Sequence, residues 1–293
     1  MYELIQAKGN SFFVDCPAKI GIVKTGEQEV VLIDAGSDKD AGKKVRQVLE
    51  RENWKATAIF NTHSHADHIG GNQYLQNQTQ CKIYAPGIEK AYTEFPVLES
   101  TTLYGGFAMK GLHNKFLMAK ESVVEPLTEE VLPEGFSILP LPGHSFDMVG
   151  FRTADDVVYL ADCLSSAETI DKYKIGYLYD VKAYLETLEM VKGLQATVFV
   201  PAHAAMTEDI APLAQYNIDK TLEVGEKIVD LCAEPVMFED LLAQLFTDYE
   251  MQMNLQQRML IGSTVKSYLS WLSDAGRVEY IFENNKMLWK KAE

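Results

Sequence analysis

The central motif of this sequence is Thr62-His63-Ser64-His65-Ala66-Asp67-His68, which holds three of the six histidines of the 293-residue chain. At the histidine and aspartate content of the chain, an HxHxDH pattern should arise by chance on the order of once in ten thousand such chains. Imidazole nitrogen and carboxylate oxygen are common ligands of transition metals. The motif therefore predicts a metal site.

The residues on either side of the motif predict a loop at the end of a β-strand. A buried strand is expected over residues 56–60, immediately before the histidines, and Gly70-Gly71 allows a close turn after them. The other patterns predict strands at 18–23 and 30–34, an amphipathic helix at 38–52 and a short helix at 72–75. Because loops on a rigid scaffold often carry catalytic groups, this placement favours a functional site.

Three further residues of metal-ligating types follow predicted strands. They are His144 after residues 136–141, Asp162 after residues 157–160, and His203 after residues 197–200. Each of them alone would be read as a structural residue. Four such groups at strand ends in one chain instead favour a shared metal centre.

Together with Leu32-Ile33-Asp34-Ala35-Gly36, these motifs make the sequence resemble the metallo-β-lactamase-fold superfamily. The resemblance is to the binuclear hydrolase branch, which includes glyoxalase II-like enzymes, and it covers about residues 10–205. It implies an α+β fold in the form of a four-layer αββα sandwich, with two sheets face to face and helices outside.

The resemblance also implies seven metal ligands, divided between two ions. The first ion takes His63, His65 and His144, and the second takes Asp67, His68 and His203, with Asp162 bridging the two. Asp34 matches a family position that supports a ligand histidine and fixes the orientation of its imidazole. An ordinary strand-end turn residue is the alternative interpretation of Asp34.

The ligand chemistry supports two metal ions independently. Five imidazoles and two carboxylates exceed what one tetrahedral zinc ion needs, but they suffice for two ions with an open position each. Two divalent ions are expected as cofactors, with Zn²⁺ in first place and iron or manganese as alternatives. Ions about 3.5–4 Å apart can share a hydroxide, which would attack the acyl carbonyl of an ester, thioester or lactone. Asp67 is the expected catalytic residue, because it can orient the hydroxide or take its proton.

Two other functions remain open at this point. A mononuclear-iron persulfide dioxygenase uses similar ligands, so the identity and number of the metal ions would distinguish it. A nucleic-acid-cleaving or nucleic-acid-binding protein would act through the C-terminal module. Cys163 follows Asp162 and does not replace it, which argues against a secreted β-lactamase. His65 stands where diiron flavoproteins of this fold carry glutamate, which argues against that oxygen-reducing branch.

Residues 86–135 form an insertion that is rich in aromatic residues and methionine. It is interpreted either as a mobile apolar lid over the acyl pocket or as a helical packing or homodimer surface. His113, in this segment, is expected at the surface and not at the metals. Further along the chain, Tyr173, Lys174 and Tyr177 are candidate substrate contacts, with an ordinary polar loop as the alternative.

The chain changes to a helical pattern after His203. Helices are expected over residues 208–233, 238–246, 255–261 and 264–273, with Gly262-Ser263 as an N-cap, followed by strands at 277–282 and 287–291. This order resembles the winged-helix module appended to some enzymes of the superfamily. The predicted domains are a catalytic domain at 1–206, a connecting helix at 207–235 and a winged-helix-like domain at 236–293.

Charge limits the partners. The chain carries 27 Lys and Arg against 42 Asp and Glu, a net charge of −15, whereas nucleic acids and anionic membranes bind basic surfaces. Residues 236–293 carry six basic and eight acidic residues, and the candidate recognition helix at 263–274 offers one Lys and one Asp. We therefore expect a small-molecule acyl substrate, no membrane and no nucleic acid.

The remaining composition indicates a cytoplasmic globular protein. Four widely separated cysteines without a CxxC pair are typical of reduced thiols. No stretch approaches the roughly 20 apolar residues of a membrane span, and the first residues do not have the pattern of a signal peptide.

Overall fold

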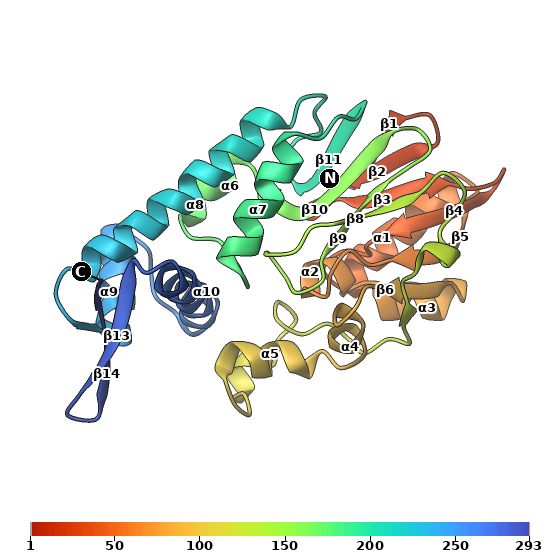
Figure 1. Cartoon of the computed structure of the whole chain (residues 1–293). Coiled ribbons are helices and arrows are strands. Elements are labelled where there is room, and N and C mark those ends of the chain that lie inside the picture. Colours follow the sequence, from red (N-terminus) through yellow and green to blue (C-terminus); the bar gives the residue numbers. More distant parts are fainter. Residues whose placement is uncertain (1, 293) are drawn as a thin grey trace.

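Two β-sheets lie face to face between outer helices in the computed structural model, which describes residues 2–292 (Figure 1). The larger sheet has the order β1-β2-β3-β4-β5-β6-β7. Its strands are β1 Glu3–Lys8, β2 Ser11–Asp15, β3 Ile20–Lys24, β4 Glu29–Ile33, β5 Lys55–Phe60, β6 Lys82–Ala85 and β7 Glu125–Pro126. Strands β1 to β4 pair antiparallel, and β4 to β7 pair parallel.

The second sheet has four strands in the order β11-β10-β9-β8. They are β8 Ser137–Pro140, β9 Val149–Arg152, β10 Val157–Ser165 and β11 Val198–His203. Strands β10 and β11 pair parallel, so both deliver their carboxyl ends to the same edge. Strand β10 is longer than the sequence predicted. The pairing register shifts around Ala161, which has φ +49, and the strand continues past Asp162 to Ser165.

Alternating side chains explain why the sheets form layers. In β4, Val31 and Ile33 belong to the core between the two sheets, whereas Val30 and Leu32 belong to the core beneath the outer helices. Successive side chains of a strand point to opposite faces, so an apolar run such as this one must be covered on both sides. Helices α1 Lys39–Arg51 and α3 Asn72–Thr79 cover the larger sheet, and α7 Val181–Lys192 and α8 Ala211–Leu231 cover the smaller one. This arrangement confirms the predicted αββα sandwich.

The insertion at residues 86–135 lies beside the ends of the strands. It contains α4 Glu89–Glu94, α5 Val97–Tyr104, the 3-10 helices η1 Lys110–Leu112 and η2 Glu129–Val131, and the edge strand β7. Two other short helices, α2 Ala66–Ile69 and α6 Ala167–Tyr173, follow β5 and β10.

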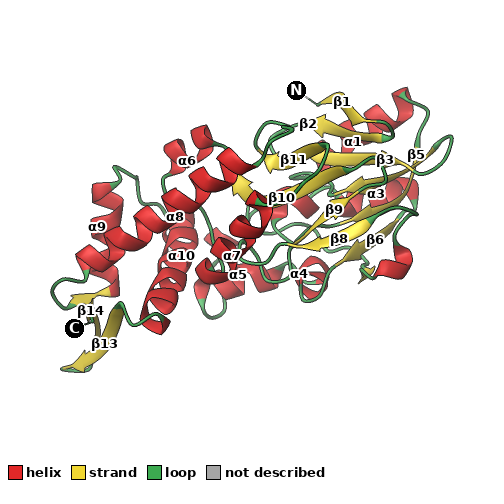
Figure 2. Ribbon diagram, turned by 45° about the horizontal axis from the view of Figure 1, so that its top comes forward, coloured by secondary structure: helices red, strands yellow, loops and turns green. Residues whose placement is uncertain are grey.

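The C-terminal region projects from one end of the sandwich (Figures 1 and 2). It consists of α9 Phe238–Asp248, α10 Leu255–Asp274 and a small sheet of β12 Val236–Met237, β13 Val278–Glu283 and β14 Lys286–Lys291. Its helices are not separate from the rest of the protein. Leu242, Tyr268 and Leu272 are buried in one cluster with Leu160 and Phe199 of the four-stranded sheet.

The prediction of two helices at 255–261 and 264–273 was wrong, because α10 is continuous from Leu255 to Asp274. Asn254 caps it, with its side chain accepting a hydrogen bond from the backbone N–H of Gln257. At Gly262, the glycine that suggested a break, a Cβ would lie 2.8 Å from Arg258 Nη1 and at an ordinary contact distance of 3.5 Å from a Leu242 methyl. Ile261 and Val265, on either side of Gly262, are buried in one cluster with Leu242 of α9, and this burial outweighs the cost of about 1 kcal/mol for glycine within a helix.

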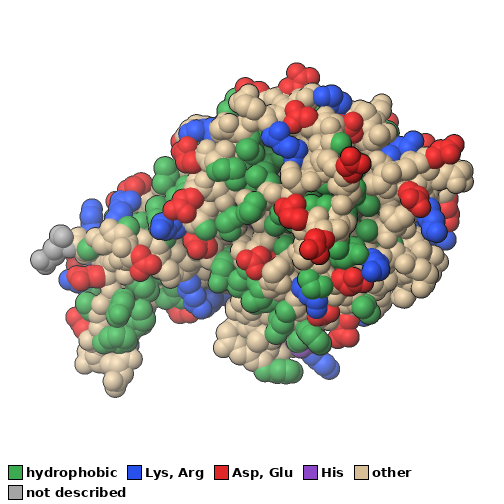
Figure 3. Space-filling view, turned by 45° about the vertical axis from the view of Figure 1, so that its right-hand side comes forward, with side chains coloured by type: hydrophobic (Ala, Val, Ile, Leu, Met, Phe, Trp, Pro, Cys, Tyr) green, Lys and Arg blue, Asp and Glu red, His purple; other side chains and the backbone are tan. Residues whose placement is uncertain are grey.

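Basic and acidic side chains are interspersed on the face of the molecule shown in Figure 3. Apolar side chains also reach the surface there and on the β13–β14 hairpin, where Tyr280 and Phe282 are exposed. Among residues 2–292, no helix combines the length and apolar character needed to cross a membrane.

Candidate metal centre

The structure brings the seven predicted ligand side chains together at one edge of the two sheets. They come from the loop after β5 (His63 and His65), helix α2 (Asp67 and His68), the loop after β8 (His144), strand β10 (Asp162) and the last residue of β11 (His203). They form two groups, and within each group the ligand atoms all lie within 4.8 Å of one another. We call His63, His65 and His144 the histidine group, and Asp67, His68, Asp162 and His203 the carboxylate-rich group.

In the histidine group, the nitrogens that face inward come from two loops, the one after β5 and the one after β8. His65 Nδ1 lies 2.9 Å from His144 Nε2. The ring of His63 stands edge-on to both neighbours, with centroid distances of 4.6 Å to His65 and 5.2 Å to His144. His63 is fully buried, and its Nε2 has no hydrogen-bond partner.

Asp162 lies between the two groups. Its Oδ1 is 3.1 Å from His68 Nε2, and its Oδ2 is 3.2 Å from His203 Nε2 and 3.5 Å from His144 Nε2. Asp67 closes the carboxylate-rich group, with Oδ2 3.3 Å from His203 Nε2. A carboxylate in the position of Asp162 can reach ligand atoms of both groups.

Unsatisfied buried atoms test whether metal ions fit this centre. Among residues 2–292, five buried side-chain atoms make no hydrogen bond, and three of them, His63 Nε2, His68 Nε2 and Asp162 Oδ1, converge here. His68 Nε2 and Asp162 Oδ1 are close enough for an ion pair, but their direction is not that of a hydrogen bond. Burying polar atoms without partners is costly, whereas metal coordination would satisfy them. The donor set therefore fits two divalent ions.

The outward nitrogens of four imidazoles are each fixed by a nearby oxygen. His68 Nδ1 lies 2.7 Å from Asp34 Oδ2, His203 Nδ1 2.8 Å from the carbonyl oxygen of Pro17, and His144 Nδ1 3.1 Å from that of Tyr177. His63 Nδ1 lies 3.0 Å from the Thr62 hydroxyl. Such contacts fix the ring orientation of ligand histidines. Asp34 also accepts hydrogen bonds from the backbone N–H and the hydroxyl of Thr62, so it connects both groups.

Burial and charge give the two groups opposite protonation. In the histidine group, burial lowers the pKa of His65 and of His144 to about 4 and holds that of His63 well below its usual range. These imidazoles are neutral at neutral pH, as metal ligands must be.

In the carboxylate-rich group, the nearby carboxylates raise the histidine pKa values instead of leaving them lowered by burial. Asp162 raises the pKa of His203 to about 10 against the opposing effect of burial. Burial would also lower the pKa of His68, but Asp162, Asp67 and Asp34 outweigh it and raise that pKa well above its usual range. Burial would raise the pKa of Asp162, yet His203 and His68 hold it well below the ordinary aspartate range.

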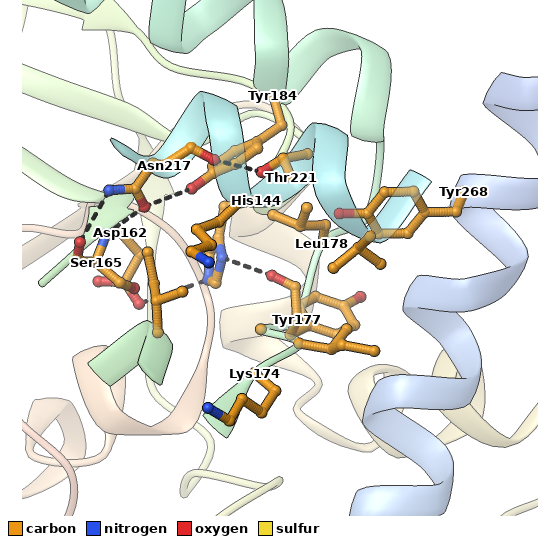
Figure 4. Close-up of a pocket in the computed structure, with 15 residues that line it drawn as sticks. His144, Asp162, Ser165, Lys174, Tyr177, Leu178, Tyr184, Asn217, Thr221 and Tyr268 are labelled. Atoms are coloured by element: carbon orange, nitrogen blue, oxygen red, sulfur yellow. Dashed lines mark hydrogen bonds and ion pairs between the residues drawn. The ribbon is translucent and has the colours of Figure 1, made fainter. Parts of the chain in front are cut away.

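Two cavities meet at His144, Asp162 and Tyr177. One, of about 180 Å³, has a wall that is mainly apolar, formed by Phe116, Leu117, Tyr177 and Leu260. The other, of about 100 Å³, extends past Lys174 and Asn217 to Tyr268 of α10 (Figure 4). Segments far apart in the sequence therefore surround the centre.

The candidate substrate contacts divide between these cavities and the surface. Tyr177 lines both cavities, and its ring lies edge-on to His65 at 5.2 Å. Lys174 lines the smaller cavity, whereas Tyr173 is half exposed and lines neither of the two. His113 is exposed and away from both ligand groups, with its ring 6.1 Å from that of Phe107.

Sequence reasoning missed two buried carboxylates of the insertion, Glu89 and Glu99. Glu99 is 8% exposed, lines the larger cavity and has Oε1 4.0 Å from His65 Nε2. Burial, and next the charge of Glu89, raise the pKa of Glu99 to about 8. For Glu99, the available signal was a single acidic residue in the otherwise uncharged stretch 97–104, and Glu89 had no such signal.

Comparisons with known proteins agree with this geometry. A family model described as the metallo-beta-lactamase superfamily matches residues 13–203. Hydroxyacylglutathione hydrolase from Rhodopseudomonas palustris (strain BisB18) is 30% identical over 133 residues, which are 45% of this chain and 43% of that protein. The same enzyme from Rhizobium etli is 26% identical over 162 residues, 55% of this chain and 51% of the relative. The chain thus spans about half the length of these curated relatives.

Two solved structures share the fold over nearly the whole chain. A beta-lactamase domain protein from Burkholderia ambifaria has a TM-score of 0.75 at 15% identity, covering 99% of this chain and 94% of its own. A metallo-beta-lactamase family protein from Thermus thermophilus has a TM-score of 0.72 at 16% identity, covering 99% and 98%. Both include the C-terminal region in the matched fold.

Proposed function

Because this chain belongs to the metallo-beta-lactamase superfamily, we propose that it is a hydrolase that uses two bound divalent metal ions to cleave a thioester, ester or lactone. The observation that carries the proposal is the convergence of seven candidate ligand side chains in two groups, with Asp162 of the second group only 3.5 Å from His144 of the first. The distant homology to hydroxyacylglutathione hydrolases covers part of the chain and favours a thioester among these substrates.

The proposed ligands are those of the two groups. The histidine group would hold one ion, the carboxylate-rich group would hold the other, and Asp162 would bridge them. Zinc is the proposed metal because imidazole dominates the ligand set, with iron or manganese as alternatives. When bound, such ions lower the pKa of water and polarise a carbonyl oxygen.

The chain's own residues would orient the reactants. Burial would raise the pKa of the Asp67 carboxyl, but His68 and His203 outweigh burial and lower it to about 2, so this carboxylate is ionised at neutral pH. We propose that it orients the attacking water or accepts its proton. Asp34, behind His68, would keep that imidazole in the orientation that ligation requires.

The two cavities suggest where the substrate lies. The apolar wall of Phe116, Leu117 and Leu260 suits an acyl chain beside the ligand groups. The smaller cavity, with Lys174 at its side, would take the thiol or alcohol portion, and Tyr177 lies between the two. A small-molecule acyl compound is therefore the proposed substrate.

The test is hydrolysis by the metal-replete protein of a matched set of substrates with one acyl group, presented as a thioester, an oxygen ester and a lactone, with RNA as a fourth substrate. We expect the thioester to be cleaved fastest and chelation followed by Zn²⁺ addition to remove and restore activity. Turnover that survives complete metal removal, or cleavage of RNA alone, would contradict the proposal.

A further inference from the structure

We infer that Glu89 is a positioning residue that holds together the two loops carrying the histidine group. The inference rests on the proposed function, because it concerns the proposed metal centre. Glu89 is the first residue of α4, in the insertion, and its side chain is fully buried. Through Glu89, the insertion would support the metal centre, a role other than that of a lid or a packing surface.

The carboxylate of Glu89 accepts hydrogen bonds from both loops. Its Oε2 accepts from the backbone N–H of Ser64 at 3.0 Å and from the Ser64 hydroxyl at 2.5 Å. Its Oε1 accepts from the Ser145 hydroxyl at 2.5 Å and from the backbone N–H of Asp147 at 3.1 Å. One carboxylate thus satisfies two donors on each side.

The position of these donors in the chain connects them to the ligands. Ser64 lies between His63 and His65, and Ser145 directly follows His144. All three residues of the histidine group are therefore next to a residue that Glu89 binds. Because His65 and His144 come from loops that are 79 residues apart in the chain, a bridge between the loops fixes the spacing of their ligand nitrogens.

The first turn of α4 is itself held close to the His144 loop. The backbone N–H of Ile88 donates to Asp147 Oδ2 at 2.8 Å, and the backbone N–H of Asp147 donates to Glu89 Oε1. The start of α4 and Asp147 therefore each donate one hydrogen bond to the other. Gly87 has φ +38, and a Cβ there would lie 1.9 Å from Asp147 Oδ2. The positive φ favours glycine here, and a larger side chain would also displace the Asp147 carboxylate.

The carboxylate-rich group is supported by other residues. Asp34 and Pro17 hold the outward nitrogens of His68 and His203. Asn217 binds both the N–H and the carbonyl of Ser165, near Asp162 (Figure 4). Replacing Glu89 should therefore affect the histidine group selectively.

Glu89→Gln is the decisive substitution, because it keeps the size of the side chain. A carboxylate accepts on both oxygens, whereas an amide must turn its NH₂ group towards one of the two pairs of donors. Each pair includes a backbone N–H, which cannot reverse its direction. Whichever way the amide is oriented, its NH₂ group faces one backbone N–H, so that hydrogen bond is lost and the hold on one loop is weakened, even where the serine hydroxyl turns to accept from the amide.

The experiment measures Zn²⁺ affinity by chelator competition in two backgrounds of the full chain. His203→Ala leaves the histidine group intact, and His65→Ala leaves the carboxylate-rich group intact. We expect Glu89→Gln to weaken Zn²⁺ binding about 10- to 100-fold in the first background and to leave it unchanged in the second. Glu94→Gln is the matched control, since Glu94 is in the same helix and pairs with Lys90, both partly exposed, without contacting either loop in the hydrogen bonds of the described residues.

The outcomes separate the possible failures. Equal Zn²⁺ affinity of Glu89→Gln and Glu94→Gln in the His203→Ala background would overturn this inference alone, and so would equal losses in both backgrounds. Failure of the wild-type chain to bind Zn²⁺ would overturn the proposed function together with it. If Glu89→Gln does not fold, Ser145→Ala decides, because it removes one donor from the His144 loop. Weaker Zn²⁺ binding in this variant supports the inference, and unchanged binding refutes it.

Discussion

Metal binding at the carboxylate-rich group should release protons at neutral pH, whereas metal binding at the histidine group should not. In the structure, both nitrogens of His68 face carboxylates, Asp34 at 2.7 Å and Asp162 at 3.1 Å. Both nitrogens of His203 also face oxygens, those of Pro17 at 2.8 Å and Asp162 at 3.2 Å. Oxygen acceptors on both sides favour the imidazolium, which must lose a proton before its Nε2 can bind a metal ion.

The size of the effect follows from the pKa values. With the pKa of His203 raised to about 10, its neutral form is populated about one part in a thousand at pH 7. The metal affinity of this group should rise about tenfold per pH unit from His203 alone. His68 contributes a second proton, because its pKa is raised as well. In the histidine group, the pKa values of His65 and His144 lie at about 4, so metal affinity there should not change above about pH 6.

The stability of the metal-free protein changes with pH in the opposite direction to its metal affinity. The raised pKa of His203 stabilises the metal-free fold fully below the unfolded-state pKa of about 6.5, and this contribution is lost as the pH rises towards about 10. The metal-free protein should therefore become less stable between these pH values, while its affinity for metal increases.

Isothermal titration calorimetry in buffers of different ionisation enthalpy measures the released protons directly. The His65→Ala variant isolates the carboxylate-rich group, and His203→Ala isolates the histidine group. We expect proton release approaching two per ion in the first variant at about pH 7 and close to none in the second. Equal proton release, or an affinity of His65→Ala that is the same at about pH 6.5 and about pH 8.5, would refute the assigned protonation states.

Three further predictions concern the ligands and the core. Asp162→Ala should lower kcat by more than about 100-fold and reduce the metal content, whereas His113→Ala should change neither, and similar behaviour of the two variants would contradict the ligand assignment. Elemental analysis should find two divalent ions per chain, and one iron ion per chain would instead favour the persulfide dioxygenase. Leu272→Ala should lower the free energy of unfolding by about 2–5 kcal/mol in denaturant titrations, because Leu272 is fully buried. A smaller loss would show that the C-terminal region is loosely attached.

The candidate ligands could be predicted because their signal is local. Three histidines and an aspartate lie within six residues, and His144 and His203 each follow a predicted strand. Strands that end at one edge of a sheet bring such residues together, so strand positions alone suggested a common site. The division into two groups came only from the family resemblance, because spacing along the chain does not determine which side chains face each other.

Glu89 left no comparable pattern in the sequence. Two of its four donors are the backbone N–H groups of Ser64 and Asp147, and a backbone donor is present at nearly every position. Nothing in the residues of the two loops therefore indicates which acid they bind. Helix α10 shows the same limit, since Gly262-Ser263 is a reasonable cap by local criteria, and the burial of Ile261 and Val265 that favours a continuous helix arises only in the folded protein.

The proposed substrate cavity depends on tertiary packing. Its apolar wall combines Leu117 from the insertion, Tyr177 from the segment after β10 and Leu260 from α10, which pack in one cluster. None of these residues is a candidate ligand, so substitutions among them can change the shape of the cavity while both ligand groups stay intact. In the proposed function, the residues that would select the acyl group are therefore not those of the metal-site motif, and the motif carries little information about the substrate.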